Sequence, residues 1–136
     1  MQGKGIPDFG EIDLPIGRHP VKRKLMAVNH DIGKYARTAF KVLDRFDQKI
    51  AGALLDVRLY TGRTHQIRVH FYANEMPVLG DKVYQPRRNR KAAPMAPRQM
   101  LHAWKLKFRH PYSGLAMSFE ALWPNDFIQV MDKMRG

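Results

Sequence analysis

Apolar and polar residues alternate with a period of two over several segments of the chain, and this pattern predicts β-strands. The first such segment carries Ile12, Leu14 and Ile16 between polar residues or proline. Pro15 favours the edge of a sheet, because proline cannot donate a backbone hydrogen bond to a neighbouring strand. After the turn-prone letters GRHP, residues 21–28 are a candidate second strand.

The same alternation predicts two β-hairpins. Residues 36–46 place Thr38, Phe40 and Val42 on one face, and residues 52–62 alternate in the same way, so these runs form the first hairpin. In the second hairpin, residues 101–111 alternate apolar residues with lysine and arginine. The letters HPYSG then form a turn into the alternating run GLAMSFEALWP.

Two segments have the spacing of short helices. Thr64 is expected to cap a helix that runs through HQIRVHFYAN, and Pro77 ends the pattern. Asn125 is expected to cap a terminal amphipathic helix. The apolar stripe of that helix consists of Phe127, Val130, Met131 and Met134.

Length and composition fit one globular domain. The 136 residues are 44% hydrophobic and include seven Phe, five Tyr and two Trp, which suffices for a core. We find no internal repeat or domain boundary, so residues 1–136 are expected to form a single domain. Its predicted class is α+β, with a mixed, mostly antiparallel β-sheet and a few short helices.

The charge of the chain suggests its partner. Lys and Arg number 24 against 12 Asp and Glu, a formal net charge of +12, which attracts polyanions such as RNA or DNA. The chain has no cysteine, which excludes disulfides and thiolate metal sites and fits a reducing compartment. No apolar run reaches transmembrane length. We therefore expect a cytoplasmic protein with no membrane association.

Residues 85–99 differ from the rest in composition. This segment is rich in arginine and proline and contains no acidic residue, so it has little to bury and is predicted to be a basic, flexible loop. The loop is either an RNA-binding element or a plain solvated linker. Its candidate RNA-binding residues are Arg87, Arg88, Arg90 and Lys91.

The stretch TGRTHQIRVH, residues 61–70, concentrates candidate chemistry. A strand that ends before it and a helix that begins near Thr64 would expose free backbone N–H groups and place Arg63 at the rim, which suits anions. His65 and Arg68 are three residues apart and share a helix face, while Gln66 points elsewhere. The alternative for either arginine is a structural role, such as an ion pair with Asp81.

Other common chemistries lack their signatures. His65 and His70 are five apart, so they do not form the i, i+4 zinc pair of a helix, and no metal site is expected. The glycine-rich phosphate-binding motifs, the serine nucleophile motif GxSxG and a cysteine nucleophile are all missing from the sequence.

Several ordered motifs resemble one enzyme family. TGRTHQIRVHFYANEMPVLGDKVY, LHAWKLKFRHPYSG and FEALWPND, preceded by GEIDLPIGRHP and GKYARTAFKVL, resemble the C-terminal portion of the catalytic domain of RluA-like RNA pseudouridine synthases. The resemblance runs from about Gly3 to Asp126. It implies part of the pseudouridine synthase fold and isomerisation of uridine in structured RNA, either rRNA or tRNA. It also implies that no metal or organic cofactor is needed.

The resemblance assigns roles to individual residues. Arg68 matches an arginine that pairs with the family's nucleophilic aspartate, although Arg63 stays open for that role. A fixed guanidinium would keep such a carboxylate ionised in a partly dry pocket. The other matched residues are expected to shape the pocket, touch RNA or line the base pocket. They are Arg63, Thr64, His65 and Gln66, with Val78 and Leu79 at the base pocket.

The chain departs from the family at an important point. Neither the His-Arg-Leu-Asp type motif that carries the aspartate nor the later base-stacking tyrosine motif occurs in this sequence. The chain therefore resembles a piece of a longer enzyme or a shortened gene product, and we expect no synthase activity from it alone. An incomplete sheet would expose apolar edges and favour self-association. The alternative is a non-catalytic basic RNA-binding module, which would be a closed monomer.

Overall fold

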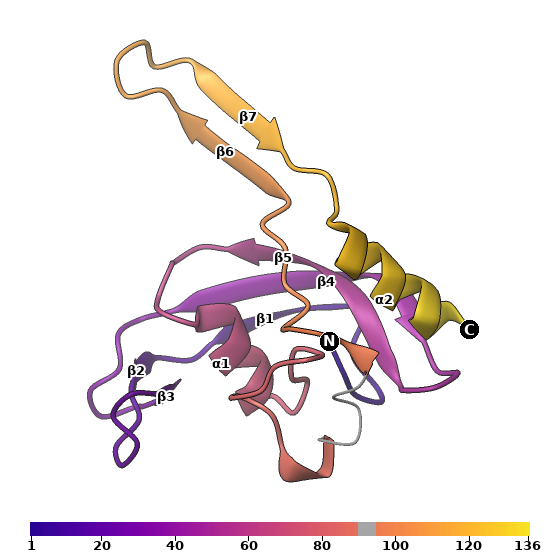
Figure 1. Cartoon of the computed structure of the whole chain (residues 1–136). Helices are drawn as coiled ribbons and strands as arrows, with labels where there is room; N and C mark the ends of the chain where they lie inside the picture. The colour runs from indigo at the N-terminus through magenta and orange to yellow at the C-terminus, as the bar shows by residue number, and fades with distance from the viewer. Residues whose placement is uncertain (90–94) are drawn as a thin grey trace.

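A computed structural model of the chain describes residues 1–89 and 95–136. Its main element is a three-stranded antiparallel sheet of order β1-β4-β5 (Figure 1). The strands are β1 (Phe9–Asp13), β4 (Arg37–Phe46) and β5 (Gly52–Leu59). The predicted first hairpin is confirmed as β4–β5. β1 lies at an edge of the sheet but ends at Asp13, so Pro15 lies outside it and the predicted strand through Ile16 is wrong as one continuous strand.

The helix α1 (Gln66–Ala73) covers one face of this sheet (Figure 1). Phe71 of α1 is fully buried and meets Phe40 of β4 edge to face, with ring centroids 5.4 Å apart. Thr38 and Phe40 point to this face as the alternation predicted, and both are buried. The pairing of β4 with β5 shifts register between Val42 and Asp44, where β4 forms a bulge.

A small antiparallel pair flanks α1. It consists of β2 (Ile16–Arg18) and β3 (Met26–Val28). Ile16 is buried against Val69 of α1 and Tyr84, so this pair extends the core beyond the main sheet. The predicted strand over residues 21–28 is therefore real only in its last three residues.

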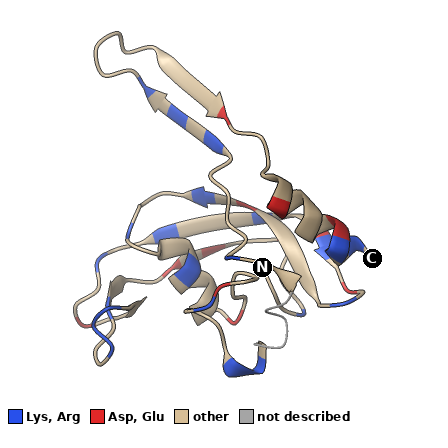
Figure 2. Ribbon diagram, in the orientation of Figure 1, with Lys and Arg blue, Asp and Glu red and all other residues tan. Residues whose placement is uncertain are grey.

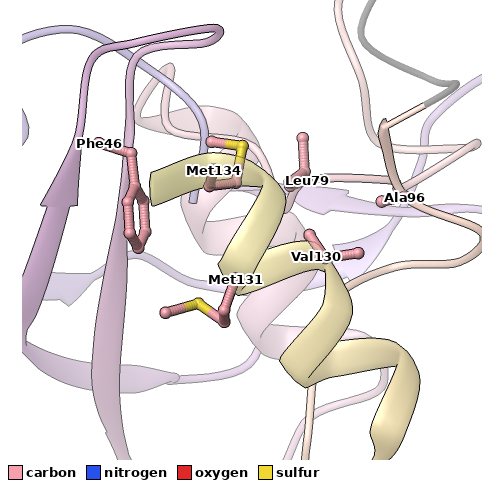
Figure 3. Close-up of a cluster of buried hydrophobic side chains, with 6 residues drawn as sticks. All are labelled: Phe46, Leu79, Ala96, Val130, Met131 and Met134. Carbon is pink, nitrogen blue, oxygen red and sulfur yellow. The ribbon is translucent and has the colours of Figure 1, made fainter. Parts of the chain in front are cut away.

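The terminal helix α2 (Asn125–Arg135) closes the other end of the core. Figure 3 shows Val130, Met131 and Met134 of α2 gathered with Phe46, Leu79 and Ala96, and all six are buried; this set is named the α2 cluster. The predicted stripe is confirmed, with Phe127 partly buried beside it. The predicted cap is wrong: Asn125 is already helical, Pro124 holds the cap position, and no side chain caps the helix.

The second hairpin consists of β6 (Lys105–Arg109) and β7 (Ala116–Glu120), as predicted. It projects away from the rest of the chain (Figure 1). Every strand pair in the described residues is antiparallel, so the predicted α+β class is confirmed. None of the described helices combines the length and apolar character needed to cross a bilayer.

The basic loop predicted over residues 85–99 contains exposed and packed parts, and its flexibility stays a prediction. Arg87 and Arg88 are exposed, whereas Arg90 and Lys91 lie outside the described residues. The later part is packed: Ala96 is buried in the α2 cluster, and Arg98 forms a bidentate pair with Asp126 at 2.7 and 2.9 Å. The composition of the loop could not predict the Arg98–Asp126 ion pair, because Asp126 lies far from the loop in the sequence.

Candidate functional site

The turn between β5 and α1 is held by the buried side chain of Gln66. Its Oε1 accepts hydrogen bonds from the Thr61 hydroxyl at 2.8 Å and from the Arg63 backbone N–H at 2.9 Å. Its Nε2 donates to the Arg37 carbonyl and to Thr38 Oγ1. Gln66 is 3% exposed, so of its two expected roles burial favours shaping the pocket over touching RNA, which stays a prediction.

A chain of hydrogen bonds continues from Gln66 into the core. Thr38 Oγ1 lies 2.8 Å from Nδ1 of His70, and Nε2 of His70 lies 2.8 Å from the Leu14 carbonyl oxygen. Because a carbonyl only accepts, Nε2 carries the proton and Nδ1 accepts from the Thr38 hydroxyl. Burial holds the pKa of His70 below its usual 6.5, although the bond to Leu14 opposes this effect. His70 is therefore a neutral structural residue.

This arrangement predicts a pH-dependent stability. The pKa of His70 is lower in the folded chain than the 6.5 of an unfolded one, so the unfolded chain takes up a proton more readily. The free energy of unfolding should hold above about pH 6.5 and fall as the pH drops below it. We expect His70→Gln, which keeps one donor and one acceptor, to reduce that slope in denaturant titrations. An identical slope in the variant would contradict the account.

Arg68 on α1 is locked to Asp81. Its Nε and Nη2 donate to the two carboxylate oxygens of Asp81 at 2.7 and 2.9 Å. The Asp81 side chain is fully buried and also accepts from the backbone N–H groups of Val83 and Tyr84, while the Arg68 side chain is 13% exposed. Arg68 therefore forms the ion pair with Asp81 that was the structural alternative for the arginines. This pair engages only Nε and Nη2 of the guanidinium.

Tyr84 supports this ion pair from the side. The guanidinium carbon of Arg68 lies 4.9 Å from the centroid of the Tyr84 ring. The Tyr84 hydroxyl lies 2.8 Å from Nδ1 of His65 and accepts the Met26 backbone N–H. Burial, followed by the nearby charge of Arg68, holds the pKa of His65 below 6.5, while Asp81 opposes the shift. His65, Arg68, Asp81 and Tyr84 thus form one connected group, named here the Arg68 cluster.

The start of α1 differs from its prediction. His65 holds the cap position in a left-handed conformation with φ of 55°, which is rare for a residue with a side chain. Thr64 is exposed and makes no capping hydrogen bond, so its predicted role as N-cap is wrong. The Gln66 side chain binds the preceding turn instead, which leaves Thr64 outside the helix.

Arg63 lies apart from the Arg68 cluster. Its Nε donates to the Tyr35 carbonyl at 2.9 Å, which fixes the side chain at the rim of the turn.

Val78 and Leu79, expected at a base pocket, are 1% and 6% exposed, and Leu79 packs in the α2 cluster. Neither lines an open surface in this chain. An open cleft of about 660 Å³ lies elsewhere, between the N-terminal residues and Glu75, and Arg88 is the only predicted residue within the described ranges that borders it.

Comparison with known proteins identifies the family. Residues 3–73 match the family model described as RNA pseudouridylate synthase, which is more than half of the chain. The chain belongs to the RNA pseudouridylate synthase family. The resemblance inferred from the sequence motifs is therefore confirmed.

Similar proteins support the same family. The chain is 43% identical over 130 residues to the ribosomal large subunit pseudouridine synthase D of Nitrosomonas europaea, covering 93% of this chain and 37% of that relative. It is 42% identical to the Escherichia coli K12 protein of the same name, covering 40% of it. The structure of human RNA pseudouridylate synthase domain containing 1 matches 90% of this chain and 51% of its own, with a TM-score of 0.74 and 27% identity. The chain thus spans about two fifths of these curated relatives' length.

Proposed function

We propose that this pseudouridylate synthase family chain supplies the arginine-bearing part of a catalytic domain that isomerises uridine to pseudouridine in ribosomal RNA. The observation that carries the proposal is the fixed position of Arg68. A guanidinium has five N–H donors, and among the described residues Asp81 takes two of those of Arg68. The remaining donors are available to a second carboxylate.

Arg68 suits this role because it is both charged and preorganised. Its hydrogen bonds to Asp81 raise its pKa above the ordinary arginine value, despite partial burial. The Tyr84 ring and the Asp81 carboxylate fix the orientation of the guanidinium, so a reacting aspartate would meet a donor that needs no rearrangement. Such a cationic partner favours the ionised form of the family's nucleophilic aspartate. Arg63 is the second choice for this role. Among the described residues only its Nε is held, by the Tyr35 carbonyl, so its guanidinium is less firmly oriented than that of Arg68.

Ribosomal RNA is the proposed substrate class. The net charge of +12 suits a polyanion, and two relatives carry names that place their activity on the ribosomal large subunit. Transfer RNA is the alternative substrate within the same chemistry. We place the protein in the cytoplasm, where such RNA is made in bacteria, and no metal or organic cofactor enters the proposal.

The competing function is a non-catalytic RNA-binding module. That hypothesis requires a closed monomer with a covered core, whereas Leu106 of the projecting hairpin is 59% exposed and Phe119 is 52% exposed. Exposed apolar residues of this kind favour a chain that belongs to a larger assembly. The synthase hypothesis is therefore preferred.

The chain alone is expected to convert no uridine. The sequence contains no match to the family's aspartate motif, so the nucleophile that the reaction requires has no counterpart here. The measurement is pseudouridine content of ribosomal RNA after incubation with the purified chain. A chimera in which the chain replaces the matched part of the Nitrosomonas europaea relative serves as the active comparison. Conversion by the chain alone would reject the need for the aspartate segment.

The exposed arginines of the basic loop are expected to bind phosphate. Arg87 and Arg88 are exposed, and the ion pair that Arg88 forms with Glu75 at 3.8 Å is itself exposed. Replacing both by glutamine should weaken RNA binding and lower the slope of log affinity against log salt by about one to two. Arg98→Gln is unsuitable as a control because that residue is anchored to Asp126. The matched control is the double variant Lys22→Gln and Lys24→Gln, which also removes two exposed charges, neither with a salt bridge among the described residues.

A further inference from the structure

The β6–β7 hairpin has two chemically different faces. Leu106 lies opposite Phe119, and Phe108 lies opposite Met117, so these four side chains share one face. The Phe108 and Phe119 rings stack with centroids 5.9 Å apart. We name this set the apolar hairpin face. The opposite face of β6 carries Lys105, Lys107 and Arg109.

Nothing among the described residues covers the apolar hairpin face. Leu106, Phe108 and Phe119 are 59%, 43% and 52% exposed, and none of the four residues belongs to a buried cluster of the core. The outer edges of β6 and β7 are also unpaired, because each strand pairs only with the other within the part of the chain that is described. An isolated two-stranded hairpin is marginally stable in water, so this one needs a partner.

We propose that the apolar hairpin face and an open edge of the hairpin dock the aspartate-bearing segment of the catalytic domain, as a separate polypeptide or as part of a longer chain. The inference rests on the proposed function. Relatives that match this chain devote about three fifths of their length to regions it does not match, which is ample for such a segment. Added strands would pair with the open edge and cover the four apolar side chains.

The arrangement of charge favours a polypeptide over RNA on this face. Figure 2 shows the basic residues of β6 along the hairpin, and Glu120 is the acidic residue that faces Lys105 across the strands. RNA that stacked on Phe108 and Phe119 would need cations beside those rings to meet its phosphates. The cations instead lie on the opposite face, so docking would bury the apolar side and leave the basic side to RNA.

A second copy of this chain is a less suitable occupant. Two copies would bring together molecules that each carry a net charge of +12, and the repulsion opposes association at low salt. Four side chains also make a small interface, well below what a stable symmetric dimer needs. Self-association is therefore treated as a competing outcome.

The test measures binding between this chain and a second polypeptide, made of the part of the Nitrosomonas europaea relative that this chain does not match. The variant carries Leu106→Thr and Phe108→Thr, because threonine retains strand propensity without the apolar bulk. The matched control carries Lys105→Thr and Lys107→Thr on the opposite face of the same strand. We expect about tenfold or greater loss of affinity in the variant and less than about twofold in the control, at a salt concentration that screens surface charge.

A second measurement covers the case in which the separate polypeptide does not fold. In the covalent chimera, amide hydrogen exchange of residues 105–109 and 116–120 should be at least about tenfold slower than in this chain alone. Equal exchange in both proteins would overturn the proposal. So would a dimer of this chain that the threonine variant abolishes, or a loss of RNA affinity confined to that variant.

These readouts separate docking from the proposed activity. Docking is measured without RNA and without turnover. A docked complex that forms no pseudouridine would reject the proposed function and keep the interface. An active chimera whose hairpin exchanges as fast as in the chain alone would reject the interface and keep the function.

Discussion

Replacing Asp81 by asparagine is expected to lower the free energy of unfolding by about 3 kcal/mol, the low end for breaking a buried ion pair. The carboxylate is fully buried, and the substitution leaves Arg68, itself 13% exposed, without its bidentate partner. Denaturant titration of the chain measures the effect. The matched control is Asp8→Asn, which removes an exposed pair with Arg45 at 2.6 Å and should cost at most about 1 kcal/mol. Equal losses in both variants would contradict this account.

The same carboxylate predicts the acid side of the stability curve. Burial alone would raise the pKa of Asp81, but hydrogen bonds from Arg68, Val83 and Tyr84 together hold it below 3.8. A carboxylate whose folded pKa is lowered stabilises the fold above the unfolded pKa, and the contribution is lost as the pH falls through the folded value. Stability should therefore drop below about pH 4, and Asp81→Asn should show a smaller drop in that range.

Removing the Arg68 guanidinium from the chimera is expected to reduce the rate of pseudouridine formation by about a hundredfold or more, the usual cost of one preorganised donor at a reacting charge. The variant is Arg68→Met, which keeps an unbranched apolar stem as far as the position of Nε and removes the rest of the guanidinium. Single-turnover measurements on ribosomal RNA give the rate. They are corrected for the folded fraction, because the variant also leaves the Asp81 carboxylate unpaired.

The Asp81→Asn chimera separates a catalytic role of Arg68 from a structural one. If Arg68 acts only by holding Asp81, the two variants should lose activity equally. If Arg68 faces the reacting aspartate, Arg68→Met should be far slower, and the acid limb of its pH–rate profile should move to higher pH because the aspartate loses its cation. Equal rates and unshifted profiles would assign Arg68 to the scaffold.

The strands could be predicted from sequence because their burial is one-sided. Residues 37–46 alternate since one face meets α1 and the other meets solvent, and the hairpin to β5 followed directly. The same alternation in β6 predicted a strand correctly, although every residue of that strand is exposed. A period of two reports which side chains share a face, and it carries no information on whether anything packs there.

The sequence predicted which residues belong to the candidate site better than it predicted the contacts between them. Helix spacing predicted that His65 and Arg68 lie together, and Asp81 was the predicted structural partner for an arginine. The central role of Gln66 and the burial of His70 were missed, because they depend on Thr38 in a distant strand. The predicted cap at Thr64 was wrong for a related reason. The Gln66 side chain accepts the hydrogen bond from the Arg63 backbone N–H in this turn, and the capping propensity of Thr64 carries no information on that contact.

The most direct test of the central claim is the amount of pseudouridine formed in ribosomal RNA by the chimera, measured beside this chain alone. The account predicts conversion by the chimera and none by the chain, because the chain contributes Arg68 and its scaffold while the relative contributes the aspartate. An inactive but folded chimera that still binds RNA would contradict it, since this chain would then be unable to complete a synthase active site.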